Sequence, residues 1–179
     1  METSLSRHKS NWPSRTSKAI YIIRCKKKEK TVQLKTSKTF DIRFSEVDSM
    51  NVVWHGSYAL YLEDAREAFG AEYGLDYMNY FRHHCYAPIA EETIRYRKPL
   101  RYGMKPRIDI IYRPTISAKV IFDYEIHDTA DESLIATGRS IQAFMDMDYQ
   151  LVLYSPEWYQ AWQEKWHVFD DVDDDLLHP

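Results

Sequence analysis

The stretch that decides the fold is SYALYLEDAREAFGAEYG at residues 57–74. Its apolar residues recur at steps of three and four, the spacing of one face of an α-helix. Gly74 is suited to end that helix. Small residues allow the helix to lie close against a sheet, and they are Ala59, Ala65, Ala68, Gly70 and Ala71. One long core helix is therefore expected.

Segments on both sides of this helix alternate apolar and polar residues, as half-buried strands do. Before it, apolar residues fall on even positions from Val32 to Phe44, with an interruption around 35–38. After a linking segment at 76–84, three runs alternate around 94–97, 107–113 and 119–127. The turn-rich segment 128–133 joins the third run to a fourth, 134–145, as a hairpin. Short connections require antiparallel pairing, so we predict an α+β fold with one antiparallel sheet.

The chain is expected to hold one domain at 32–154 between two different ends. Residues 1–38 carry eleven Lys/Arg against two Glu, whereas residues 170–175 hold five Asp. The basic arm at 1–31 lacks the interleaved aromatics of a nucleic-acid site, so a solvated extension is preferred over a transit peptide. In 155–179, Ser155 and Pro156 predict an N-cap and first residue of a short helix. Its tryptophan stripe should pack on the domain or on a partner chain, and it comprises Trp158, Trp162 and Trp166.

Composition excludes several classes of protein. Two cysteines, Cys25 and Cys85, support neither a disulfide framework nor a cysteine zinc site, and a reducing, cytoplasmic location is expected. Adjacent His83, His84 and Cys85 make a poor metal site without a second cluster, so no metal and no cofactor are predicted. No apolar run approaches the length of a membrane span, so we expect a soluble protein that binds no membrane.

Two runs of residues resemble the signature of the 4-hydroxybenzoyl-CoA thioesterase family. The first is FSEVDSMNVVWHGSY at 44–58 with YLEDAR at 61–66, and the second is YRKPLRYG at 96–103. The resemblance spans about residues 38–146 and implies the hotdog fold, an antiparallel sheet wrapped around a central helix. Asn51 replaces the usual Gly, and Asn is the non-Gly residue best suited to a left-handed turn. Met104 replaces a frequent acidic residue.

The resemblance implies that this chain hydrolyses an acyl-CoA with Asp48 as the catalytic carboxylate. In a loop that leads into a helix, this carboxylate can act as a general base on water. It can also attack the carbonyl directly to give a mixed anhydride, and both routes stay open. The alternative is that Asp48 is only a turn former beside Ser49.

Residues at the start of the helix are candidates for binding the thioester. Backbone N–H groups around His55 to Tyr58 lie at the positive end of the helix dipole, where an oxyanion can accept from them. Gly56 lets the acyl group approach the backbone closely, Ser57 belongs to the same turn, and Tyr58 either lines the pocket or packs in the core.

Two charged or titratable residues are further candidates. His55 can orient the substrate or exchange a proton with Asp48 or the departing thiol, or it can be a cap or packing residue. Glu63 occupies a helical position where other hotdog branches carry the catalytic base. It is also three residues from Arg66, so the two can simply form an ion pair.

Lys98 and Arg101 belong to a basic cluster that suits the phosphates of CoA, although a solvated strand edge is the preferred explanation for each of them. Proteins that this chain resembles pair their sheets, so we expect a dimer or tetramer with active sites across the interface. The alternatives are an acyl-carrier-protein thioesterase and a non-catalytic acyl-CoA-binding module. Hydroxyacyl dehydration on the same fold is not favoured, because the sequence does not contain the catalytic His and carboxylate arrangement of the dehydratase branch.

Overall fold

The structure is a computed structural model that describes residues 33–170, all within one compact unit. The basic extension predicted at 1–31 and most of the acidic tail therefore lie outside the described residues. Among the residues described, no helix combines the length and apolar character that a bilayer crossing requires.

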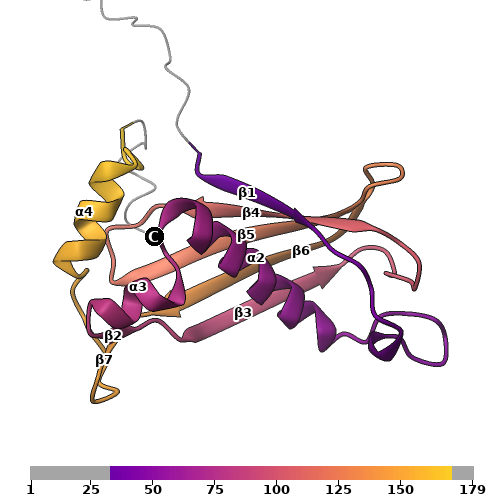
Figure 1. Ribbon diagram of the computed structural model, residues 1–179, viewed down its shortest axis with the longest axis horizontal. Helices are drawn as coiled ribbons and strands as arrows, with labels where there is room; N and C mark the ends of the chain where they lie inside the picture. Colours follow the sequence, from indigo (N-terminus) through magenta and orange to yellow (C-terminus); the bar gives the residue numbers. More distant parts are fainter. Residues whose placement is uncertain (1–32, 171–179) are drawn as a thin grey trace, which may run out of the picture. The chain divides into compact units, whose positions relative to one another are not determined.

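Five antiparallel strands form the main sheet in the order β1-β4-β5-β6-β3 (Figure 1). The strands are β1 (Lys35–Thr39), β3 (Ile89–Tyr96), β4 (Pro106–Arg113), β5 (Lys119–Asp128) and β6 (Leu134–Ala143). A row of paired residues crosses the sheet through Thr36, Ile110, Tyr124, Gly138 and Ile94. A small second sheet pairs β2 (Cys85–Tyr86) with β7 (Met145–Asp146). The predicted antiparallel pairing and the hairpin at 128–133 are confirmed.

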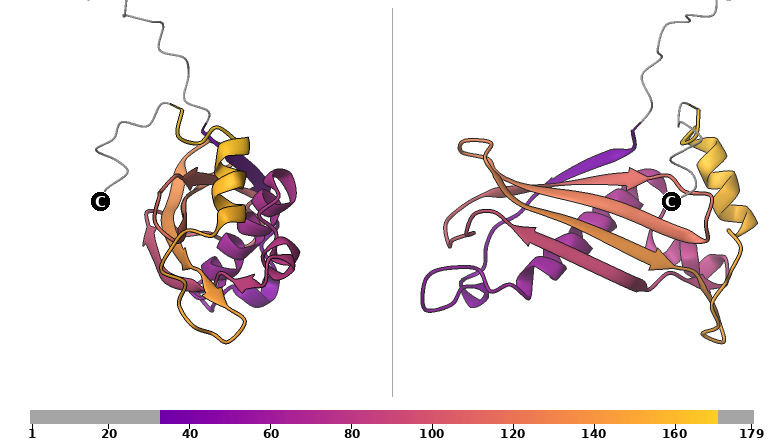
Figure 2. Two further views of the ribbon diagram at one scale, coloured as in Figure 1. Left: turned by 90° about the vertical axis from the view of Figure 1, so that its left-hand side faces the viewer. Right: turned by 180° about the vertical axis from the view of Figure 1, so that it is seen from behind.

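The predicted long helix is α2 (Ser57–Tyr73), which lies across one face of the sheet (Figures 1 and 2). Leu62, Ala65 and Phe69 face the sheet and are at most 1% exposed. Gly74 ends the helix in the left-handed conformation with φ of 82°, and its N–H donates to the Gly70 carbonyl at 2.8 Å. Burial of this apolar face, more than helix propensity, holds α2 in place.

The first strand differs from its prediction. The interruption expected around 35–38 is wrong, because Lys35–Thr39 form β1 itself. β1 is an edge strand whose inward side chains are polar and reach α2. Thr36 bonds to Glu72, and Lys38 lies 3.8 Å from Asp64. Because the inward side chains of β1 are polar, its sequence does not alternate between apolar and polar residues, and the pattern that predicts a strand is missing.

The linking segment and the C-terminal helix also differ from their predictions. Residues 76–84 contain α3 (Tyr77–Arg82), capped by Asp76, whose carboxylate accepts from the Asn79 N–H at 2.9 Å. The final helix, α4 (Glu157–Lys165), has Pro156 rather than Ser155 at its N-cap. The Ser155 hydroxyl is buried without a partner in the described part of the chain, so the predicted cap is wrong by one residue.

The tryptophan stripe of α4 packs on the domain, as one of the two alternatives predicted. Trp162 and Trp166 both donate from Nε1 to the carbonyl of Tyr73, at 2.7 and 3.1 Å. Trp158 packs edge-on against Tyr80 with ring centroids 5.6 Å apart. This helix therefore packs against the C-terminal end of α2 and against Tyr80 of α3.

Candidate functional site

Asp48 lies in a tight loop between η1 (Phe44–Glu46) and α2, and its carboxylate shapes that loop. Oδ1 accepts from the N–H of Met50 at 2.8 Å and of Val52 at 3.1 Å. The Asp48 N–H donates to the Val52 carbonyl at 2.9 Å, and Asn51 has φ of 57°, the left-handed turn predicted for it. Oδ2 has no partner within residues 33–170. One oxygen thus fixes the loop while the other remains available for chemistry.

The connection after β3 joins this loop from more than forty residues away in sequence. The Val53 N–H donates to the Leu100 carbonyl at 2.9 Å. Arg101 donates from Nη1 to the Met50 carbonyl at 3.4 Å, and the rings of Phe44 and Tyr102 meet edge-on. The two stretches that carry the family resemblance are therefore brought together by the fold.

Between them lies a cavity of about 410 Å³, here called the Asp48 cavity. It includes four of the predicted residues, Asp48, His55, Tyr58 and Lys98. Residues whose place in it was not predicted include Trp54 and Tyr96, and Arg97 of the predicted basic cluster also lines it. The cavity is therefore lined by two cationic side chains, Arg97 and Lys98, and by a single carboxylate, that of Asp48. Arg101 does not line the cavity but holds the Asp48 loop from outside.

The start of α2 offers fewer backbone donors than the sequence suggests. The Ser57 N–H donates to the Trp54 carbonyl at 2.9 Å, and the Tyr58 N–H donates to the His55 carbonyl at 3.3 Å. The His55 and Gly56 N–H groups donate to no atom of the described residues. Of the predicted oxyanion donors, these two remain available to a substrate.

Tyr58 both packs in the core and lines the cavity. Its side chain is 2% exposed, and its ring meets that of Tyr96 edge-on at 4.9 Å. Burial raises the pKa of Tyr58, so its hydroxyl stays protonated near neutral pH. The two alternatives considered for this residue are therefore compatible.

Gly56 lies under the indole ring of Trp54. A Cβ added at Gly56 would lie 2.1 Å from that ring, and the φ of −66° is one that any residue adopts. Trp54 is 57% exposed, so contact with a ring that can move, and not the backbone conformation, is what favours glycine at this position.

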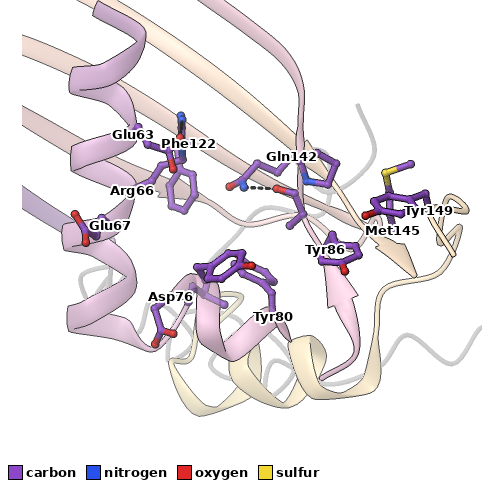
Figure 3. A pocket seen from close by; sticks show the side chains of 14 residues that line it. Glu63, Arg66, Glu67, Asp76, Tyr80, Tyr86, Phe122, Gln142, Met145 and Tyr149 are labelled. Atoms are coloured by element: carbon purple, nitrogen blue, oxygen red, sulfur yellow. Dashed lines mark hydrogen bonds and ion pairs between the residues drawn. The ribbon is translucent and has the colours of Figure 1, made fainter. Parts of the chain in front are cut away.

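Glu63 lies away from the Asp48 cavity. It forms the predicted ion pair with Arg66 and lines a second cavity of about 690 Å³, here called the Tyr80 cavity (Figure 3). Other side chains that line it are Arg66, Tyr80, Tyr86, Phe122, Gln142 and Tyr149. No sequence motif indicated this cavity. The N-cap at Asp76 was the one available signal that a helix stands at its wall.

Arg66 fastens α2 to the sheet beside the Tyr80 cavity. Its guanidinium donates to the Tyr124 hydroxyl at 3.1 Å and to Glu92 at 3.3 Å, and it pairs with Glu63. The Tyr124 hydroxyl lies 2.7 Å from that of Ser140. Only 9% of the Arg66 side chain is exposed, and two carboxylates already balance its charge. Its role here is structural.

A group on the opposite face of the sheet resembles a metal site. Ligand atoms of Asp109, Glu125 and His127 lie within 4.8 Å of one another. Burial raises the pKa of Asp109, but hydrogen bonds hold it below its ordinary value, and their donors are Ser37, Lys35 and Arg107. This carboxylate is already satisfied by cations, so the group is an ion-pair cluster that ties β1 to β4.

Comparison with known proteins places this chain in a thioesterase-like family. The sequence profile described as the thioesterase-like superfamily matches residues 42–163. The Bacillus subtilis (strain 168) protein YneP, provisionally named an acyl-CoA thioesterase, is 25% identical over 134 residues, 72% of this chain and 96% of that protein. The chloroplastic acyl-acyl carrier protein thioesterase ATL3 of Arabidopsis thaliana is 27% identical over 111 residues, 62% of this chain and 58% of that protein.

A solved structure of a 4-hydroxybenzoyl-CoA thioesterase variant with 4-hydroxybenzoyl-CoA superposes with a TM-score of 0.64. Identity is 16%, and the match covers 72% of this chain and 98% of that one. This likeness confirms the predicted hotdog fold.

Proposed function

The chain belongs to the thioesterase-like superfamily, and on that premise we propose that it hydrolyses an acyl-CoA thioester in the Asp48 cavity. One observation carries the proposal. Asp48 is fixed through Oδ1 by two backbone N–H groups, while Oδ2 is unpartnered within residues 33–170, in the cavity that also holds His55 and the start of α2. A carboxylate held in place beside helix-terminal donors is what thioester hydrolysis needs.

The chemistry consumes one water molecule. With Asp48 as general base, Oδ2 takes a proton from water while the water oxygen bonds to the thioester carbon. The carbonyl oxygen becomes an oxyanion that accepts from the His55 and Gly56 N–H groups. The carbon–sulfur bond then breaks, and the thiolate recovers a proton from Asp48 or His55. With Asp48 as nucleophile, Oδ2 bonds to the carbon and the carbon–sulfur bond breaks, so that the thiolate leaves and a mixed anhydride forms. Water then cleaves the anhydride to the free acid and the Asp48 carboxylate, and the proton it releases goes to the thiolate.

The carrier is proposed to be CoA because the cavity has a basic side. Arg97 and Lys98 line it, and Arg101 lies behind the Asp48 loop, so phosphates have cationic partners. An acyl carrier protein, as in the name of the Arabidopsis relative, is the second candidate because an acidic protein would meet the same charges. A non-catalytic acyl-CoA-binding module is the third.

Self-association is proposed through β3. This strand pairs with β6 on one side, and its other edge pairs with no strand among the described residues. An open edge of eight residues is a template for another chain. If two copies pair antiparallel about the middle of β3, Ile89 lies opposite Tyr96 of the partner subunit. The Asp48 cavity of each copy then adjoins the Tyr80 cavity of the other.

The test is release of free thiol from short, long and aromatic acyl-CoAs by the wild-type protein and Asp48→Asn. Asparagine keeps the oxygen that both N–H groups need but cannot act as base or nucleophile, so kcat should fall at least about a hundredfold. Asp128→Asn is the matched control, because Asp128 also accepts a backbone N–H, from Ala130, in a distant hairpin. Equal rates for Asp48→Asn and wild type would disprove the role of Asp48.

The same assay tests which acyl carrier the protein uses and whether it is an enzyme. Cleavage of acyl-carrier-protein esters without cleavage of CoA esters would show that the carrier is an acyl carrier protein and not CoA. Absence of turnover with either carrier, combined with measurable acyl-CoA binding, would favour the binding module.

A further inference from the structure

The segment 46–54, here called the Asp48 hairpin, is closed at its base by a backbone hydrogen bond. The Trp54 N–H donates to the Glu46 carbonyl at 2.8 Å. Nearer the tip, the Asp48 N–H donates to the Val52 carbonyl at 2.9 Å. These bonds hold the hairpin together, but they do not fix how it lies relative to α2.

The side chain of Glu46 supplies that contact with α2. Its Oε2 accepts from the Tyr61 hydroxyl at 2.7 Å and from the Arg43 N–H at 2.9 Å. Tyr61 belongs to the buried face of α2, is 4% exposed and packs against the ring of Phe40 with centroids 4.3 Å apart. Burial and the bond to Glu46 raise the pKa of Tyr61, so its phenol remains a donor near neutral pH.

This contact joins the two parts of the candidate site. Glu46 is two residues before Asp48, and Tyr61 lies in the second turn of the helix whose start carries the available donors, His55 and Gly56. Among the described residues, no other side-chain hydrogen bond joins the Asp48 hairpin to α2. The remaining contacts of the hairpin lead to the connection after β3. Without the bond to α2, the hairpin could turn about those contacts as a unit.

We propose that Glu46 and Tyr61 are positioning residues, whose hydrogen bond sets the distance between the Asp48 carboxylate and the oxyanion donors at the start of α2. This inference rests on the proposed function and extends it to two residues that line neither cavity. Misplacement of a catalytic group by about 1 Å can cost about a hundredfold in rate. Substrate binding does not depend on that distance, so the effect should fall on kcat rather than on KM.

The test measures kcat and KM for hydrolysis of the best acyl-CoA. Tyr61→Phe removes the hydroxyl but keeps the ring, and it should lower kcat about tenfold with KM within about twofold of wild type. Glu46→Gln keeps an acceptor oxygen and should stay within about threefold of the wild-type kcat, whereas Glu46→Ala should fall as far as Tyr61→Phe. Tyr73→Phe is the matched control, because it removes a hydroxyl of the same helix that donates to the Lys35 carbonyl at 3.0 Å.

Combination with Asp48→Asn separates positioning from a purely structural role. If the bond acts through the Asp48 carboxylate, Tyr61→Phe should lower the residual rate of Asp48→Asn by less than about twofold. A loss of about tenfold in that background as well would mean that the bond supports the fold in general, and would overturn the inference. An unchanged kcat for Tyr61→Phe, or an equal loss for Tyr73→Phe, would overturn it too.

Hydrogen exchange distinguishes failure of this inference from failure of the proposed function. Tyr61→Phe should speed amide exchange in residues 44–56 by about five- to tenfold, and Tyr73→Phe should leave this segment unchanged. Faster exchange in a protein that cleaves no thioester would sink the proposed function but support the role of the bond in holding the Asp48 hairpin. Unchanged exchange in Tyr61→Phe would overturn the inference whatever the activity.

Discussion

Gly56 has two explanations, and they make different predictions. The sequence suggests that the acyl group needs the space, whereas the structure places the Trp54 ring 2.1 Å from a would-be Cβ. In either case Gly56→Ala should lower kcat/KM by about tenfold or more, since small displacements at the start of α2 misplace the thioester. Steady-state hydrolysis of the best acyl-CoA measures the loss.

A double-mutant cycle with Trp54→Ala separates the explanations. If the ring alone demands glycine, Gly56→Ala costs little once Trp54 is alanine. If the two losses simply add, the acyl group itself needs the space and the ring explanation fails. Circular dichroism of all three variants checks that α2 is retained.

Residue identities near the motif were predictable because they are local in sequence. Asp48, His55 and Tyr58 lie within eleven residues, and the structure brings them to one cavity with Lys98. The sequence did not predict that the backbone N–H groups of Ser57 and Tyr58 are already hydrogen-bonded. These bonds form because a tight turn brings the carbonyls of Trp54 and His55 close to them.

Among loop elements, the Asp48 turn has a counterpart in the turn that follows β7. Asp146 accepts through Oδ1 from the N–H groups of Asp148 and Gln150, both at 2.9 Å, and Tyr149 has φ of 61°. In both turns, one Asp oxygen accepts from the backbone N–H groups two and four residues later. Only Asp48, and not Asp146, lines the Asp48 cavity. The structural role of Asp48 and its proposed catalytic role can therefore be tested separately.

We predict that Asp48→Ala and Asp146→Ala each lower the free energy of unfolding by about 1 kcal/mol, because each leaves two backbone N–H groups without their acceptor. Asp48→Asn keeps that acceptor and should change stability much less. Urea unfolding followed by tryptophan fluorescence measures all three. A large loss for Asp48→Asn would mean that its missing activity reflects the loop rather than the carboxylate.

Elements with apolar periodicity were predicted and those without it were not. α2, β4, β5 and β6 bury alternating or helical faces, so their positions follow from sequence. β1 is held by polar contacts at an edge, and α3 is only six residues long with one buried side chain, Tyr80. Both depend on tertiary contacts that a local pattern does not contain. The thioesterase family was predictable because its motif is long and contiguous.

For the whole molecule, the proposed pairing through the open edge of β3 predicts how the two cavities combine. They follow one another along α2, since Tyr58 belongs to one cavity and Glu63 to the other, about 8 Å further along the helix axis at 1.5 Å per residue. At the wall of the Tyr80 cavity, Arg66 of α2 forms an ion pair with Glu92 of β3. The two cavities of one copy are separate, whereas the proposed antiparallel pairing of two β3 edges would bring the Asp48 cavity of each copy next to the Tyr80 cavity of the other.

Mixing two inactive variants tests this arrangement. Asp48→Asn removes the carboxylate, and Ala87→Phe fills the Tyr80 cavity from its wall. If each site combines Asp48 of one copy with the Tyr80 cavity of its partner, a mixed dimer has one intact site. Random exchange makes half of the dimers mixed, so the mixture should recover about a quarter of the wild-type rate. If each site is built within one copy, the mixture should recover no activity.

Two controls complete the test. A mixture of either variant with the Asp48→Asn/Ala87→Phe double variant should stay inactive under both arrangements. Ala161→Phe places the same large ring at an exposed position on α4 and should leave activity unchanged.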